Sequence, residues 1–112
     1  MSVTVKPLIQ AKYAASSVTT EYTAPASTKA IVDKFTATNT DSGAQTISVH
    51  IVPSGGSAGA SNLITSALSV PAGESVDLPE MKNHVLAAGD FIAAVASVPD
   101  KVVIRASGRE VT

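Results

Sequence analysis

Residues 45–52 have the sequence QTISVHIV, in which apolar and polar side chains alternate. The apolar positions are Ile47, Val49 and Ile51. Successive side chains of a β-strand point to opposite faces of its sheet, so these three share one face and His50 lies on the other. The pattern predicts a strand that buries one face and leaves His50 in solvent.

Strand signals of the same kind recur along the whole chain. β-branched residues are abundant, and turn residues interrupt the sequence every 8 to 12 positions or so, a spacing typical of a sandwich or barrel. We expect about eight or nine short strands in all. Besides 45–52 they lie at residues 8–13, 18–23, 30–39, 62–70, 75–78, 91–97 and 102–107, with a short terminal strand after Ser107-Gly108.

Several connections have recognisable turn chemistry. Residues 40–43, TDSG, predict a hairpin between the strands on either side, and Pro99-Asp100 predicts a second hairpin further on. Residues 71–74, PAGE, form a Pro/Gly turn. Residues 80–88 fit either a short helical turn or an irregular crossing. The mixed faces of the strand at 30–39 favour a β-bulge or a buried edge near Asp33.

These elements predict an all-β fold, an antiparallel β-sandwich of jelly-roll-like type, because short antiparallel strands must stack or close to hide their apolar faces. An immunoglobulin-like sandwich is the weaker alternative, since the chain has no Trp and no Cys pair. Its 112 residues fit one domain spanning 1–112. Residues 1–17 are either the first strand of the sandwich or an arm exchanged between subunits.

The composition narrows the classes of function. Charged residues make up 15% of the chain, against about 25% in an average domain, and the net charge is −1. No basic stripe with aromatic platforms is present, so we expect no nucleic-acid partner. The sequence has no cysteine, which suits a reducing cytoplasm, and no apolar run approaches the ~20 residues of a membrane-spanning helix. A soluble protein with no membrane partner is expected.

No motif supports catalysis or metal binding. Residues 55–59, GGSAG, match the nucleophile-elbow pattern around Ser57, with His84 downstream, but an elbow needs a following helix and the residues after Gly59 favour loop and strand. His50 and His84 have no further ligand at metal-binding spacing. We therefore expect no catalytic residues, no metal and no cofactor.

Two carboxylate pairs could in principle perform acid/base chemistry. They are Glu74 with Asp77, and Asp90 with Asp100. Each pair lies at predicted turns, where acidic side chains commonly bond the local backbone. A structural role is the better interpretation for all four.

Two features are candidates for contact with a partner. The glycine-rich loop supplies the first, because binding residues often lie on loops carried by a rigid scaffold. Its candidate residues are Ser54, Gly55, Gly56, Ser57, Ala58 and Gly59. The second is the pair Arg105 and Arg109, which share one strand face and can either meet an acidic partner or pair with Asp33 or Glu110.

Five segments together resemble a group of small proteins encoded beside head and tail genes in tailed bacteriophages and prophages. They are YTAP at 22–25, ATNT at 37–40, VHIVPSGG at 49–56, VLAAGDFI at 85–92 and IRASG at 104–108. The resemblance covers residues 22–111. It implies a virion structural protein, either a capsid decoration or cement protein or a neck or tail accessory, with no active-site residues.

The resemblance also implies the partners and the place of action. These are other phage particle proteins of the capsid, neck or tail, further copies of the same chain in a homo-oligomer, and the virion itself after synthesis in the host bacterial cytoplasm. A carbohydrate- or receptor-binding module of a phage fibre is the alternative. Sugar sites usually need exposed aromatic side chains, and aromatics are only 4% of this chain.

Overall fold

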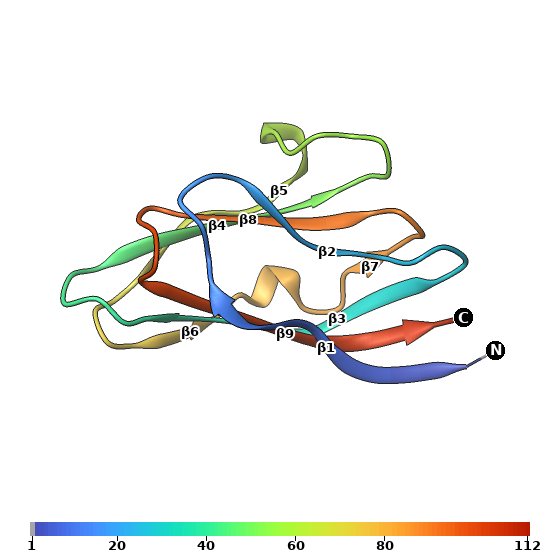
Figure 1. Ribbon diagram of the computed structural model, residues 1–112, viewed down its shortest axis with the longest axis horizontal. Coiled ribbons are helices and arrows are strands. Elements are labelled where there is room, and N and C mark those ends of the chain that lie inside the picture. Colours follow the sequence, from blue (N-terminus) through green and yellow to red (C-terminus); the bar gives the residue numbers. More distant parts are fainter. Residues whose placement is uncertain (1) are drawn as a thin grey trace.

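The computed structural model describes residues 2–112, which form nine strands and two 3₁₀ turns (Figure 1). The strands are β1 (Val3–Tyr13), β2 (Thr19–Thr23), β3 (Lys29–Asn39), β4 (Gln45–Val52), β5 (Leu63–Val70), β6 (Ser75–Asp77), β7 (Val85–Leu86), β8 (Phe91–Ala96) and β9 (Val102–Val111). The turns are η1 (Ala60–Asn62) and η2 (Pro79–Met81). Residues 80–88 thus contain the end of a short helical turn and a two-residue strand.

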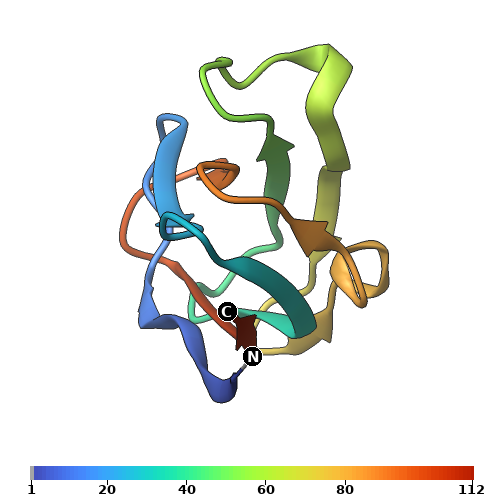
Figure 2. The same ribbon diagram turned by 90° about the vertical axis from the view of Figure 1, so that its right-hand side faces the viewer.

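The strands form two antiparallel sheets that pack face to face (Figure 2). The first sheet has the order β1-β9-β3-β6, with β7 also pairing with β3, and the second sheet has the order β2-β8-β4-β5. Apolar side chains from both sheets meet in one core between them. The predicted all-β antiparallel sandwich is confirmed.

The strand pairs are nested in the sequence, which makes the sandwich a jelly roll. The innermost pair is β4 with β5, and around it follow β3 with β6, β2 with β8, and β1 with β9. The chain is therefore one long hairpin. Rolling it up brings β3 beside β9 and β4 beside β8, which completes the two sheets.

Both predicted hairpins are wrong in their pairing. β3 and β4 lie in different sheets, as do β8 and β9, so the connections at 40–43 and 97–101 carry the chain from one sheet to the other. At the 40–43 connection, hydrogen bonds from the buried Asn39 side chain take the place of the backbone bonds that a hairpin would form. Its Nδ2 donates to the carbonyls of Gly43 (2.8 Å) and Val70 (2.9 Å), and its Oδ1 accepts from the Asp41 N–H (2.8 Å).

The predicted bulge near Asp33 is present. The register of β3 against β9 shifts between Val32 and Lys34, so Val32 and Phe35 are both fully buried although three positions separate them. An extra residue reverses the alternation of faces. This explains why a strict period of two gives β3 no apolar face.

β1 and β9 are longer than expected. β1 begins at Val3 and pairs with β9 of the same chain, so residues 3–13 form the first strand of the sandwich here. β9 runs without a break to Val111, and the predicted turn at Ser107-Gly108 is wrong. Gly108 lies inside the strand because a Cβ there would be 2.2 Å from the carbonyl oxygen of Ile31 and 2.7 Å from Leu8 Cδ1. Close packing, and not a turn, requires this glycine.

Aliphatic side chains make up nearly the whole core, with Phe35 as its one fully buried aromatic side chain among residues 2–112. η2 contacts both β3 and β5, and its buried Met81 fills the side of the sandwich between the two sheets there. The core therefore supports the inner faces of both sheets, and candidate contact residues must lie on loops, outer faces or edges.

Candidate functional site

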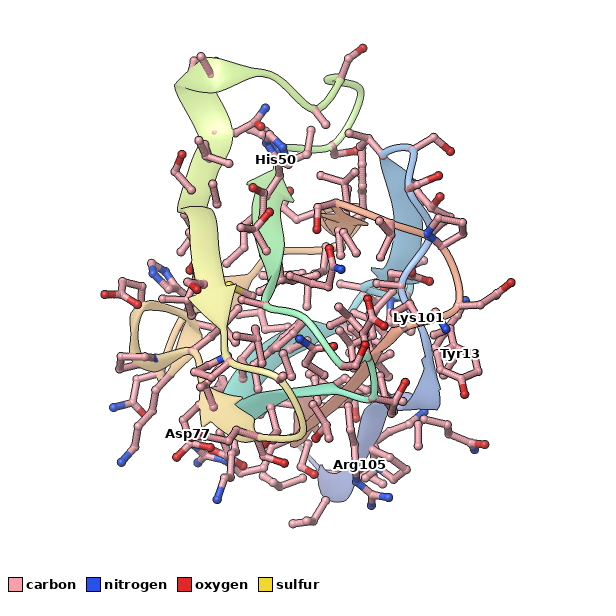
Figure 3. All side chains as sticks on the ribbon, turned by 90° about the vertical axis from the view of Figure 1, so that its left-hand side faces the viewer. Tyr13, His50, Asp77, Lys101 and Arg105 are labelled. Atoms are coloured by element: carbon pink, nitrogen blue, oxygen red, sulfur yellow. The ribbon has the colours of Figure 1, made fainter. Side chains whose placement is uncertain are left out.

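The glycine-rich loop lies at the tip of the rolled hairpin, between β4 and β5. It folds back over the outer face of the second sheet (Figure 3), where His50 is seen beneath it. Val52 and His50 lie on the face of β4 that points away from the core. Even so, Val52 is fully buried and only 8% of His50 is exposed. The prediction that His50 faces solvent is wrong, because the chain's own loop covers it.

Asn62 ties the far side of this loop to His50. Asn62 Oδ1 is 2.9 Å from His50 Nδ1 and accepts from the Gly59 N–H at 3.0 Å, while Asn62 Nδ2 donates to the Ser57 carbonyl at 2.9 Å. His50 Nδ1 also lies 3.1 Å from the Gly59 carbonyl, so this nitrogen carries the proton. These contacts occupy backbone groups that a ligand would otherwise reach.

Asp90 holds the near side of the loop. Its Oδ1 accepts from the Ser54 N–H and its Oδ2 from the Ala87 N–H, each at 2.9 Å, so one carboxylate joins two loops. Gly89 has a φ of +86°, and a Cβ there would be 2.5 Å from Ser54 Oγ. Only glycine fits this position without strain. Asp90 therefore has the structural role predicted for it, and the loop has a defined shape.

The loop offers no catalytic arrangement. Ser57 is exposed, and the residues after Gly59 form the three-residue turn η1 and then β5, so no helix N-terminus supports an oxyanion. No group of three His, Cys, Asp or Glu side chains within residues 2–112 is placed to hold a metal ion. None of the helical turns in the described part of the chain is long and apolar enough to span a membrane.

Arg105 and Arg109 lie on the outer face of the first sheet, on the opposite side of the molecule from the loop, as the positions of Arg105 and His50 in Figure 3 show. Arg109 binds Asp33 through Nη2–Oδ1 (2.9 Å) and Nε–Oδ1 (3.1 Å). Arg105 is exposed and forms no ion pair with any residue in 2–112. The two candidate contact regions are thus separate, and Arg109 is already paired.

Polar contacts close the side of the sandwich between β1 and β2. Lys12 Nζ is 2.7 Å from Glu21 Oε1, and the Glu21 side chain is only 1% exposed. The Tyr22 hydroxyl donates to Glu110 Oε2 at 2.5 Å, and Lys6 lies 3.5 Å from the other oxygen of Glu110. Burial, and then the hydrogen bond and negative charge of Glu110, raise the pKa of Tyr22 above its usual value.

The outer face of the first sheet carries an apolar patch that the sequence analysis missed. It consists of Val3, Val5, Ile31, Val85 and Val111, which we call the outer patch. Val5 and Ile31 both pair with Arg109 from opposite sides, and Val85 pairs with Ile31. The row of paired residues therefore crosses four strands, with the Arg109–Asp33 ion pair inside the patch. Val5 is 76% exposed and Val85 is 56% exposed. No sequence signal pointed to this patch, because its members come from four separate segments.

No protein-family model matches the chain, and no curated protein matches it. A solved structure is similar in fold, with a TM-score of 0.59 over 98% of this chain and 88% of the other chain, at 12% sequence identity. It is described by the words "Bacillus endospore appendages form a novel family of disulfide-linked pili". At this identity the likeness shows the shared fold alone.

Proposed function

We propose that this protein is a non-enzymatic structural subunit that associates with copies of itself. The outer patch is the observation that carries the proposal. Its exposed Val3, Val5 and Val85 lie on one sheet face with the half-buried Ile31 and Val111, and apolar side chains gathered in this way mark an interaction surface more strongly than scattered ones. Association would cover these side chains and leave the core unchanged.

The rest of the surface is suited to dense packing. With 15% charged residues, few charges lose their hydration when two copies meet, and Ala, Ser and Thr lose little side-chain entropy on burial. Arg109 adds little to the cost of burial, because it already has its partner in Asp33. A low-charge surface of this kind favours contact with many neighbours.

The likeness to the pilus protein supports self-assembly as a use of this fold. Those appendages are described as disulfide-linked pili, and the alignment covers most of both chains. The 112 residues of this protein contain no cysteine. Contacts made by these residues would therefore be non-covalent, through side-chain packing and backbone hydrogen bonds.

A bacteriophage particle is the setting we propose for this subunit, as a decoration or cement protein of the capsid or as an accessory of the neck or tail. The support is the resemblance over residues 22–111 to small proteins encoded beside head and tail genes. Quantitative mass spectrometry of purified phage particles tests it. Many copies per particle would indicate decoration, a few copies would indicate the neck or tail, and absence from every particle would contradict the setting.

Light scattering after size exclusion, at several protein concentrations, tests self-association itself. We expect the molar mass to rise to that of a defined oligomer with increasing concentration. Val85→Lys places a charge in the outer patch and should weaken association. Val18→Lys is the matched control, because Val18 is 51% exposed but lies outside the patch. A monomer at every concentration would contradict the proposal.

A further inference from the structure

The outer edge of β1 has backbone groups that point away from the sheet. Ser2 and Thr112 exchange both hydrogen bonds, at 3.0 and 2.9 Å, so they form a hydrogen-bonded pair of the antiparallel ladder. The register continues without a shift from Val3 opposite Val111 to Pro7 opposite Ser107. Because the pairs alternate, Val3, Val5 and Pro7 direct their backbone groups outward.

Pro7 agrees with this assignment and sets a limit to the open edge. Proline has no N–H, and within a sheet it fits where its nitrogen faces away from the neighbouring strand. Register shifts follow between Pro7 and Ile9 and between Ile9 and Lys12, and Lys12 then binds Glu21. Bulges and prolines prevent regular pairing of an edge, so the open part is confined to the segment from Val3 to Pro7.

We infer that two copies of this chain pair antiparallel through the β1 edge, about a two-fold axis at Thr4. In this register Val3 faces Val5 of the second copy, and Val5 faces Val3 of the second copy. Each of these pairs exchanges both of its hydrogen bonds, so every outward N–H and C=O of Val3 and Val5 is satisfied. The inference rests on the proposed self-association and names one of its contacts. The paired edges join the two outer patches but leave Val85, on β7, uncovered, so burial of Val85 requires a second contact between such dimers.

The side chains on both faces fit this register. On the outer face the Val3 and Val5 side chains, 53% and 76% exposed, become cross-strand neighbours and join the two outer patches into one. On the inner face Thr4 meets Thr4 of the second copy, and Lys6 meets Ser2 of the second copy. Lys6 therefore faces no like charge and keeps its contact with Glu110.

The outermost strands of the second sheet are less suited to such pairing. In β5, Ala67 has a φ of +45° and its N–H bonds Ser48 Oγ, which breaks the strand's regular geometry. β2 has five residues with a register shift between Thr20 and Tyr22. β1 combines length, regular backbone and exposed apolar side chains, so we assign the contact to β1.

Val5→Pro tests the backbone contact. The Val5 N–H points outward, so proline there removes no hydrogen bond of the monomer, and the melting temperature and circular dichroism should change little. The dimer should weaken by about tenfold or more, measured by light scattering or sedimentation. Val5→Ala is the matched variant, because it shortens the side chain and keeps the N–H. If Val5→Ala and Val5→Pro weaken the dimer equally, the edge is not the contact.

Thr4→Cys tests the register, since the chain has no other cysteine. Thr4 and its symmetry mate form a non-hydrogen-bonded pair with Cα atoms about 4.5 Å apart, inside the disulfide range of about 4.4–6.8 Å. We expect a covalent dimer after mild oxidation, seen by non-reducing electrophoresis. Ser66→Cys, on the exposed edge of β5, is the control and should remain monomeric there.

The outcomes separate this inference from the proposed function. A wild-type monomer at every concentration overturns both. An oligomer that Val85→Lys disrupts, but that Val5→Pro leaves intact and Thr4→Cys does not cross-link, keeps self-association and overturns the β1 edge. Loss of the dimer in Val5→Pro together with cross-linking of Thr4→Cys supports the paired edge.

Discussion

Single side chains hold together the connections, loops and sides of this fold, where no backbone hydrogen bonds join neighbouring strands. Asn39 satisfies the backbone of the corner between the two sheets, Asp90 joins two loops, and Tyr22 reaches Glu110 across the side of the sandwich. Sequence reasoning assigned Asp90 to local hydrogen bonding and paired Arg109 with Asp33 as one option, and both are observed. It gave no role to Asn39, because an asparagine at a strand end has no distinctive pattern.

Tyr22 should keep its proton to an unusually high pH. The unfolded chain loses this proton near pH 10, the usual value, whereas burial and Glu110 raise the pKa in the folded protein. The stabilisation that follows is complete below pH 10 and declines as the pH rises toward the folded pKa. In a Tyr13→Phe background, Tyr22 is the one tyrosine left, and its ionisation can be followed by absorbance as the pH is raised. The midpoint of this titration should lie at a higher pH in the folded variant than in the same variant in denaturant. Equal midpoints would contradict the buried contact.

Strands and loops show the limits of local pattern. The alternation of residues 45–52 gave β4 correctly, and Gly and Pro marked most turns, because both signals act within a few residues. The same turn residues occur in hairpins and in connections between sheets, so they do not indicate which strands pair. For this reason the hairpins predicted at the 40–43 and 97–101 connections are wrong. At Gly108 a glycine that permits close packing was interpreted as a turn.

Gly108→Ala should destabilise the protein by about 1–3 kcal/mol, because the added Cβ meets the Ile31 carbonyl and Leu8 and forces two strands apart. Urea unfolding measures the change. Gly43→Ala is the matched control, since nothing lies within 4 Å of its added Cβ, and its effect should stay within about 0.5 kcal/mol. Equal effects of the two substitutions would contradict the close packing of β9 against β1 and β3.

At the scale of the whole molecule, nesting places the chain ends side by side and the glycine-rich loop at the tip of the roll. Figure 1 shows the two ends together at one end of the sandwich. The outermost strand pair, β1 with β9, joins residues from opposite ends of the sequence, as in Val3 with Val111. The same arrangement leaves β1 at the border of its sheet, where its outward backbone groups can meet a second copy.

This topology should make folding slow for a chain of this length. Most strand pairs are distant in sequence, so the entropy of closing long loops must be lost before their contacts form. We expect refolding in milliseconds to seconds, as for other all-β domains, measured by stopped-flow tyrosine fluorescence after dilution from urea. Relaxation in microseconds would contradict the nested pairing. Val5→Pro should leave this rate unchanged if its effect is confined to the interface.

Local signals in the sequence predict the all-β class, the positions of most strands, the glycine-rich loop, and either a bulge or a buried edge near Asp33. These follow from the period of the side chains and from turn chemistry, both of which are local. Tertiary packing determines which strands pair, places the loop over His50, and brings four valines and Ile31 from four segments onto one face beside an open edge. Alternation shows that a face is buried, but the burying partner is set by packing between segments that are distant in the chain.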